Sequence, residues 1–360
     1  MLSVTIRACR LTYTPNILRT LPRDCTFTTT ATHFGMGKNN KKKSSIPDEK
    51  HLQLPLHSTA ATTPVIDTHT HLLTTYSWYR SKYPTPQFND LFEFVRGMYA
   101  GRNIKAIVDV WCEPPVPPVW KELADSAISP EDRALKWGGV DYWFVMGVHP
   151  HEAKHYNDAV EKTLLEAMAH PRCVGWGEMG LDYHYDHSPR GIQQEVFTRQ
   201  LRKAIELKKP LTIHTREAEE DTERILKAEV PVDHQIHIHC FTDSPEFAQR
   251  LLDHFPNLHI GLTGVISYST NLNTSATVRH MVSRPEGPRF LLETDAPYMV
   301  PGNIYNSLPE VKGKLPLCHT AMIPWVADFA AGSGLEGWDT MRIMQRANEN
   351  ASRVYGIPIS

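Results

Sequence analysis

Histidines and acidic residues recur at the ends of short apolar stretches of this sequence. In PVIDTHTHL, residues 64–72, Asp67, His69 and His71 follow Val65 and Ile66 at alternate positions. Alternate side chains of a strand point to the same side, so this spacing predicts three ionisable groups on one face. Such groups are costly to bury unless something binds them. Imidazole and carboxylate are ligands for Zn²⁺, Mn²⁺ and related divalent cations, so the stretch indicates a metal site.

The same residue types end four further apolar stretches. The sequence places Glu178 in GWGEMGLDYH, His214 in PLTIHTREA, His239 in QIHIHCFT and Asp295 in FLLETDAPY. His237 shares a face with His239, and the sequence leaves the choice between them open, although His239 lies nearer the strand end. Each residue alone is as easily explained by a buried side chain or a turn. Their joint occurrence favours a metal site.

Short apolar segments rich in Val and Ile must position these residues. The predicted strands are Val65–His69, Lys105–Val110, Tyr142–Val148, Cys173–Gly177, Leu211–His214, Gln235–His239, Leu258–Leu262 and Arg289–Glu293. Amphipathic periodicity predicts helices at Asp158–Ala169, Gln193–Leu207, Glu219–Lys227 and Ser244–His254. This alternation predicts an α/β fold, a (β/α)₈ TIM-type barrel over residues 63–360. In such a barrel the carboxyl ends of the strands converge on one face and bring the ionisable residues together.

Two long connections interrupt the regular alternation. Thr74–Arg102 is rich in aromatic residues and prolines, and Glu113–Gly139 opens with EPPVPPVW. Both are predicted as insertions on the βα loops, where barrels vary most. The proline-rich loop also allows a different hypothesis, in which the chain is a non-catalytic interaction protein. The loop would then bind a protein partner as a polyproline II ligand.

The first 62 residues are predicted as a flexible leader, from their low hydrophobicity and their bias to Ser, Thr, Lys and Asn. Their first half carries several arginines and a single acid, Asp24. That composition suits a mitochondrial presequence and a disordered leader equally well.

Composition excludes several classes of protein. A formal net charge of −2 gives no basic excess for an architectural DNA binder. No GxGxxG follows the first predicted strand, which argues against a dinucleotide site. No apolar run is long enough for a membrane span. The six cysteines form no CxxC, so we expect reduced thiols in an intracellular protein of the cytoplasm or nucleus. The mitochondrion is the alternative if the leader is a presequence.

At this point the motifs resemble the TatD family of metal-dependent deoxyribonucleases, a branch of the amidohydrolase superfamily. The family pattern is matched in order by DTHTH, GVHPHEA, GEMGLDYH, IHTREA, HCFT, ETDAPY and NENASRVYGI, from about residue 64 to 357. The chain departs from the pattern at Thr242 and Asp243, and in GKLPLCHTAMIPW. It is therefore identified as a divergent, eukaryotic-type member.

The resemblance implies hydrolysis of phosphodiester bonds, often in DNA, by water activated by two divalent metal ions, Mg, Mn or Zn. It assigns the metal ligands to His69, His71, Glu178, His214, His239 and Asp295. Glu178 is expected to bridge the two metals, and Asp295 to act as the catalytic base. An open alternative keeps the metal site and changes the bond to another small ester or an amide.

Three further residues are expected to meet the substrate. His149 and His151 fall in the loop that the family uses for this purpose, and Arg216 could contact a phosphate. A surface salt bridge from Arg216 to Glu217 or Glu220 is an equally good interpretation.

Overall fold

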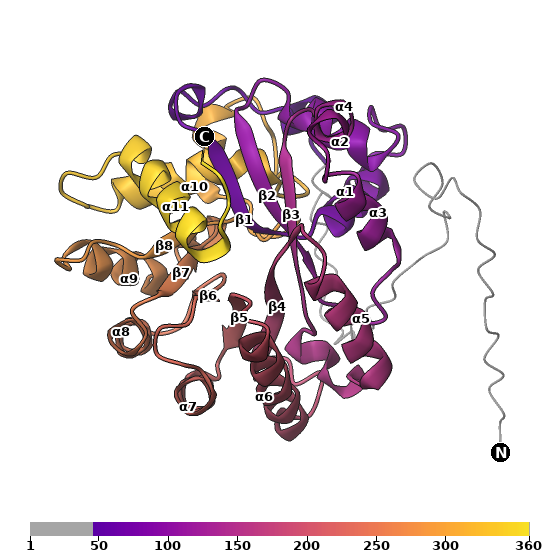
Figure 1. The fold of residues 1–360 in the computed structure, drawn as a ribbon. Helices are drawn as coiled ribbons and strands as arrows, with labels where there is room; N and C mark the ends of the chain where they lie inside the picture. The colour runs from indigo at the N-terminus through magenta and orange to yellow at the C-terminus, as the bar shows by residue number, and fades with distance from the viewer. Residues whose placement is uncertain (1–45, 360) are drawn as a thin grey trace, which may run out of the picture.

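The computed structural model describes residues 46–359, and its centre is one sheet of eight parallel strands in sequence order. The strands are β1 (Val65–Thr70), β2 (Ile104–Trp111), β3 (Asp141–Met146), β4 (Cys173–Asp182), β5 (Leu211–Arg216), β6 (Ile236–Ile238), β7 (Leu258–Leu262) and β8 (Phe290–Leu292). Helices surround the strands on the outside (Figure 1). All eight predicted strands are confirmed; the bounds of β7 are as predicted, and the other seven strands differ at one or both ends.

The sheet closes into a barrel through the segment that follows β8. The amide of Asp295 donates to the carbonyl of His69, and the amide of His71 donates to the carbonyl of Ala296, both at 2.9 Å. Thr70 and Ala296 also form a parallel bridge. These bonds join the last strand to the first and confirm the predicted TIM-type barrel.

The helices include the four predicted ones, at nearly the expected bounds. The α-helices are α1 (Leu72–Lys82), α2 (Leu91–Tyr99), α3 (Val119–Asp125), α4 (Pro130–Trp137), α5 (Asp158–Met168), α6 (Arg190–Glu206), α7 (Glu219–Glu229), α8 (Pro245–His254), α9 (Asn273–Val282), α10 (Ile323–Gly332) and α11 (Thr340–Tyr355). Short 3-10 helices are η1 (Glu49–Leu52), η2 (Thr59–Ala61), η3 (Pro150–His155), η4 (Gly264–Ser267), η5 (Gly302–Ser307) and η6 (Thr320–Met322).

The two long connections contain helices rather than irregular loops. Helices α1 and α2 lie between β1 and β2, and α3 and α4 lie between β2 and β3. Asp90 caps α2 by accepting from the amide of Glu93 at 2.8 Å, and Trp120 and Trp137 are buried. Prolines and aromatic residues obscure the helical period in these segments, so the sequence did not reveal the helices.

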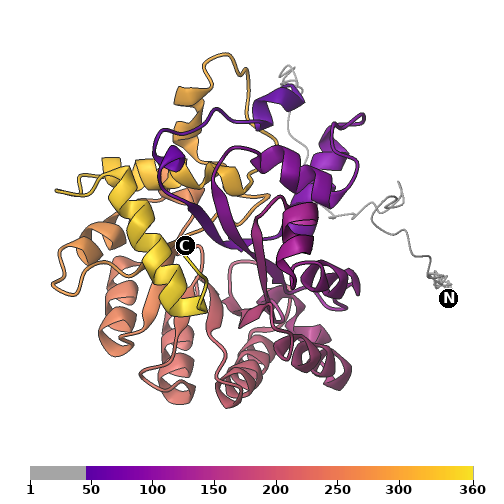
Figure 2. The ribbon, with the colours of Figure 1, turned by 45° about the horizontal axis from the view of Figure 1, so that its top comes forward.

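The amino-terminal ends of the strands form what we call the closed end of the barrel. Ile66, Val108 and Leu291 meet inside the barrel, and the end of α11 packs on them through Val354 and Ile357. Figure 2 shows α11, in yellow, running beside the strands, with the carboxyl terminus in front of them. An apolar layer therefore fills this end. We call the opposite end, where the strands finish, the mouth.

Secondary structure is present in part of the segment that the sequence assigns to the leader. Residues 46–62 were expected to belong to the flexible leader, yet they carry η1 and η2 and pack on the barrel. Leu52 and Leu54 are buried, and the Tyr83 hydroxyl donates to the carbonyl of Pro47 at 3.0 Å. The leader prediction is wrong for this stretch because its leucines find a hydrophobic surface. The rest of the predicted leader, with the presequence, lies outside the described residues.

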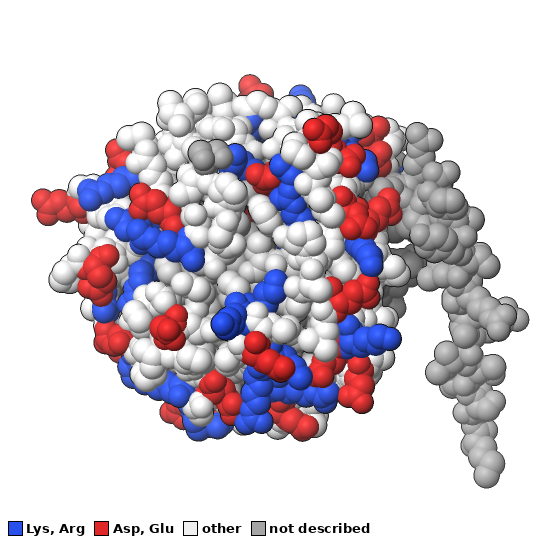
Figure 3. Space-filling view, viewed as in Figure 1, with Lys and Arg blue, Asp and Glu red and all other residues white. Residues whose placement is uncertain are grey.

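Charged side chains are interspersed by sign over the face seen in Figure 3. This agrees with the small net charge of the sequence. Within residues 46–359, no helix is both long enough and apolar enough to cross a bilayer.

Candidate metal centre

The predicted ligands converge at the mouth of the barrel from five different strands. His239 and Asp295 follow β6 and β8, and His214 lies inside β5. The strand β4 is longer than predicted, because it pairs with β5 as far as Asp182. Glu178 therefore lies inside β4 rather than at its end.

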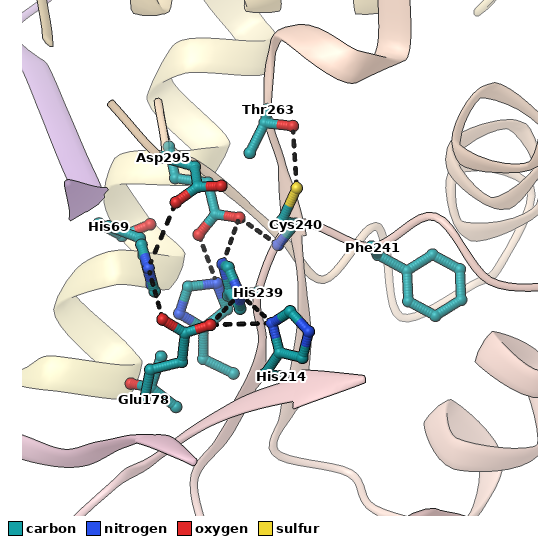
Figure 4. Close-up of polar contacts among 12 residues, drawn as sticks. His69, Glu178, His214, His239, Cys240, Phe241, Thr263 and Asp295 are labelled. Atoms are coloured by element: carbon teal, nitrogen blue, oxygen red, sulfur yellow. Dashed lines mark hydrogen bonds and ion pairs between the residues drawn. The ribbon is translucent and has the colours of Figure 1, made fainter. Parts of the chain in front are cut away.

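The two carboxylate oxygens of Glu178 face two different groups of imidazoles. Its Oε1 lies 2.7 Å from His239 Nε2, 2.9 Å from His214 Nδ1 and 3.4 Å from His149 Nε2. Its Oε2 lies 3.6 Å from His69 Nε2 and 3.8 Å from His71 Nε2. Figure 4 shows one Glu178 oxygen directed at His69 and the other at His214 and His239, while the His69 and His239 rings stack with their centroids 4.0 Å apart. This is the placement that a carboxylate needs to bridge two cations.

Asp295 completes the group around Oε2. Its Oδ1 lies 3.3 Å from His71 Nε2 and 3.8 Å from His69 Nε2. The backbone φ of Asp295 is +52°, a left-handed conformation that Asp tolerates better than most residues. This conformation accompanies the turn of the chain away from β8 at the centre of the cluster.

The buried polar atoms of the cluster test whether cations fit there. Both ring nitrogens of His69 are buried without a hydrogen-bond partner, as are His214 Nε2 and His239 Nδ1. Within residues 46–359, no Lys or Arg pairs with Glu178 or Asp295, whose side chains are 3% and 12% exposed. Buried carboxylates need compensating positive charge. The donor set and its excess negative charge therefore fit divalent cations.

The pKa shifts of the clustered histidines and of Glu178 also indicate that the site favours positive charge. Burial lowers the pKa of His69 and of His149 to about 4, which keeps both imidazoles neutral and their lone pairs available. For His71 and His214, burial is outweighed by the facing carboxylates, which raise each pKa to about 9. Against the effect of burial, the surrounding histidines hold the pKa of Glu178 well below its usual range. The carboxylates thus favour the protonated forms of His71 and His214. Bound cations would displace these protons.

His149 and His151 occupy different positions. His149 was assigned to the substrate by the sequence, yet its Nε2 faces the same Glu178 oxygen as His214 and His239. His151 lies farther out and pairs through Nε2 with Asp182 at 2.8 Å. Asp182 Oδ2 also lies 3.4 Å from His214 Nε2. This carboxylate orients two imidazoles, a role that the sequence did not reveal.

Arg216 makes neither of the salt bridges that the sequence allowed. The described contacts of its guanidinium place its central carbon 4.9 Å from the centre of the Tyr185 ring. The side chain is partly exposed near the mouth and lies outside the ligand cluster.

Asp67 does not join His69 and His71, although the sequence placed all three on one face. Its carboxylate accepts from the Thr294 amide at 3.0 Å, the Thr294 hydroxyl at 2.6 Å and the Thr320 hydroxyl at 2.8 Å. The register of β1 is irregular between Asp67 and Thr70, which breaks the strict alternation. Asp67 instead ties β1 to the segment that carries Asp295.

A second buried network supports His239 and was also missed. Glu293 Oε2 lies 2.9 Å from His237 Nε2, and Glu293 Oε1 lies 3.9 Å from His239 Nδ1. His237 Nδ1 lies 2.8 Å from the Tyr355 hydroxyl, which also bonds to Thr212. The structure thus separates the two histidines that the sequence left open, with His239 in the cluster and His237 beneath it. Only the alternating HIH spacing signalled this second layer.

Comparison with known proteins gives a family match over most of the chain. A profile described as TatD related DNase matches residues 66–356. The human protein named 3'-5' RNA nuclease TATDN2 is 39% identical over 249 residues, which is 68% of this chain and 30% of the human protein. The 3'-5' ssDNA/RNA exonuclease TatD of Rahnella sp. is 33% identical over 197 residues, 52% of this chain and 73% of that protein. The chain thus spans less than a third of its human relative.

Solved structures share the barrel. YJJV, a TatD homologue from Escherichia coli K12, superposes with a TM-score of 0.63 at 21% identity, covering 82% of this chain and 98% of that chain. A hydrolase TatD family protein from Entamoeba histolytica gives a TM-score of 0.64 at 17% identity, covering 82% and 99%. At these identities the likeness shows a common fold.

Proposed function

Because the chain belongs to the TatD family of metal-dependent nucleases, within the amidohydrolase superfamily, we propose that it hydrolyses phosphodiester bonds of single-stranded nucleic acid from the 3′ end. The sequence favoured DNA as the substrate. The names of the relatives include both RNA and single-stranded DNA, so we take unpaired DNA and RNA together as the substrate class.

The placement of Glu178 carries the proposal. Its two oxygens face two groups of imidazoles at the mouth, which is the end of a TIM-type barrel where active sites are found. We assign one cation to His69, His71, Asp295 and Glu178 Oε2. We assign the other to His149, His214, His239 and Glu178 Oε1.

Two divalent cations, when bound, supply positive charge to the phosphate oxygens and make a water molecule more acidic. The chain's own residues then position the reactants. The pKa of Asp295 is held below its usual range, against burial, by His71 and His239, so this carboxylate is ionised and can accept a proton from the attacking water. Asp182 holds His151 and His214 in fixed orientations at the edge of the site.

Hydrolysis of 3′-end-labelled and 5′-end-labelled single strands tests the proposal. We expect both DNA and RNA oligonucleotides to be shortened from the 3′ end with Mg²⁺ or Mn²⁺, and the activity to disappear with a chelator. Asp295→Asn should lower the rate at least ~100-fold, because it replaces a charged ligand with a neutral one and removes the base.

Asp233→Asn is the matched control, because this exposed carboxylate precedes β6 at the closed end. Its activity should equal that of the unmodified protein. Hydrolysis that survives both the chelator and Asp295→Asn would refute the proposal. A metal-dependent protein that cleaves only small esters or amides in a substrate panel would replace it with the other hydrolase hypothesis.

A further inference from the structure

Exposed aromatic side chains are confined to the mouth of the barrel. Among the Phe, Trp and Tyr residues of segment 46–359, only Tyr185 and Tyr298 are exposed, at 51% and 43%. Tyr185 lies just after β4, and Tyr298 lies just after β8. Large apolar rings left in water commonly mark a binding surface, and here both lie beside the candidate metal centre.

A continuous row of rings connects Tyr185 to the ligand cluster. The Tyr185 and His187 rings lie nearly parallel, with an interplanar angle of 8° and centroids 5.5 Å apart. His151 contacts both rings edge-on, and its own ring lies 4.3 Å from that of His149. His149 in turn faces Glu178. The exposed stack therefore begins two imidazoles away from the bridging carboxylate.

Positive charge accompanies this stack. The guanidinium carbon of Arg216 lies 4.9 Å from the centre of the Tyr185 ring. In the described chain Arg216 forms no salt bridge, so its charge is free to attract a phosphate. An aromatic ring beside an arginine is the pairing that proteins use to bind a base and its backbone together.

Tyr298 occupies the opposite side of the mouth. Its amide donates to the carbonyl of Asp295 at 3.0 Å, which fixes it close to the cluster. Its ring contacts Trp78 of α1 edge-on at 5.3 Å, and the ammonium of Lys82 lies 5.7 Å from the Trp78 ring. Because β4 and β8 are four strands apart in a ring of eight, the two tyrosines flank the cluster from opposite sides.

We propose that Tyr185, with His187 and Arg216, and Tyr298, with Trp78, are two nucleobase-stacking subsites. They would hold unpaired bases on either side of the phosphodiester bond that lies over the metal centre. The inference rests on the proposed nuclease function and deepens it. Stacking on an aromatic ring tolerates any base, so these subsites select for unpaired strands rather than for a sequence. A duplex keeps its bases paired and stacked and cannot use them without fraying.

The test compares two oligonucleotides that differ only in their bases. One is a single strand of mixed sequence, and the other carries abasic residues at its last three 3′ positions. Both have phosphorothioate linkages at the 3′ end to slow hydrolysis. Binding to the full chain is measured by fluorescence anisotropy with Mn²⁺ present, and kcat and KM are measured separately on the unmodified oligonucleotide.

Tyr185→Ala and Tyr298→Ala should each weaken binding of the mixed strand roughly tenfold and raise its KM similarly. Neither alanine substitution should change binding of the abasic strand, which has no bases to stack at its 3′ end. Tyr185→Phe and Tyr298→Phe keep the rings and should stay within about twofold of the unmodified protein. Leu135→Ala, at an exposed leucine of α4, controls for loss of surface apolar area.

The outcomes separate this inference from the proposed function. If the chain cleaves oligonucleotides but the alanine variants bind both strands as the unmodified protein does, the subsites are wrong and the nuclease function stands. If binding requires the rings and the bases while no nucleic acid is cleaved, the subsites stand and the proposed reaction is wrong. If the unmodified protein binds neither oligonucleotide, the proposed subsites are wrong.

Discussion

The two ends of the barrel are built from opposite kinds of residue. At the closed end, Ile66, Val108 and Leu291 pack with the end of α11 in an apolar layer. At the mouth, His69, Glu178 and His239 are as deeply buried, yet several of their polar atoms lack hydrogen-bond partners. The apolar side chains of the closed end are stabilised by packing alone. At the mouth, the buried carboxylates and unpaired ring nitrogens are compensated only if a positively charged group binds there.

This difference separates stability from function along the barrel axis. Burial of apolar side chains stabilises the fold, whereas the buried carboxylates of the mouth cost free energy unless compensated. Substitutions at the mouth should therefore change activity and metal content. Substitutions at the closed end should change the free energy of unfolding.

The largest effect is expected at Glu178, which faces both groups of imidazoles. Glu178→Gln removes the shared negative charge, so metal content should fall and the rate on single strands should drop at least ~100-fold. Elemental analysis and initial rates measure this. A variant that keeps two metal ions and normal activity would break the comparison, because the mouth would then not depend on its central carboxylate.

A smaller effect is expected at Asp182, which touches no proposed cation directly. Asp182→Asn weakens the hold on His151 and His214, and metal affinity and kcat should fall roughly 10- to 100-fold. Metal titration measures the affinity for the metal, and steady-state kinetics measures kcat. Asp233→Asn, at the exposed carboxylate before β6, is the matched control and should leave both unchanged.

At the closed end the expected effect moves from activity to stability. Ile357 is fully buried against the barrel interior, and Ile357→Ala should lower the free energy of unfolding by about 2 kcal/mol. The estimate is at the low end for such a change because the neighbouring apolar side chains can partly fill the space. Denaturant unfolding measures the loss. A large drop in kcat for the folded variant would contradict the separation of the two ends.

The smallest effect is a pH dependence at His259, near the start of β7. Burial lowers its pKa to about 3, and its Nδ1 lies 3.1 Å from the carbonyl of Asn257. As the pH falls below 6.5, the unfolded chain gains a proton that the folded chain does not, so stability decreases. At pH 5.5 the loss from this residue should be about 1.4 kcal/mol.

His259→Asn keeps an N–H donor and removes the titration. Its free energy of unfolding should therefore fall less between pH 7.5 and 5.5 than that of the unmodified protein, by about the same 1.4 kcal/mol. Urea unfolding at the two pH values measures the difference. Equal losses in both proteins would show that the pKa of His259 is the same in the folded and unfolded states.

Some of the cluster could be predicted because it depends on local patterns. Each strand is a short apolar run, and the ionisable residue that follows it is visible in the same few positions, as with His239 and Asp295. The closed arrangement of parallel strands then requires these positions to meet. The helices of the two long connections were harder to see, because prolines and aromatic residues obscure the helical period and because Trp120 and Trp137 pack on distant rings such as Phe144 and Phe92.

The sequence by itself determined the alternation of strands and helices, and which residue types stand at the strand ends, because both depend on spacing along the chain. Only the tertiary structure decided that Asp67 turns to Thr294 and Thr320, that His149 joins the cluster, and that His237 lies beneath it. It also decided that Tyr185 and Tyr298 are exposed at the mouth, after β4 and after β8. These outcomes depend on strand register, on a local irregularity in β1 and on closure of the barrel, which no short window of sequence specifies.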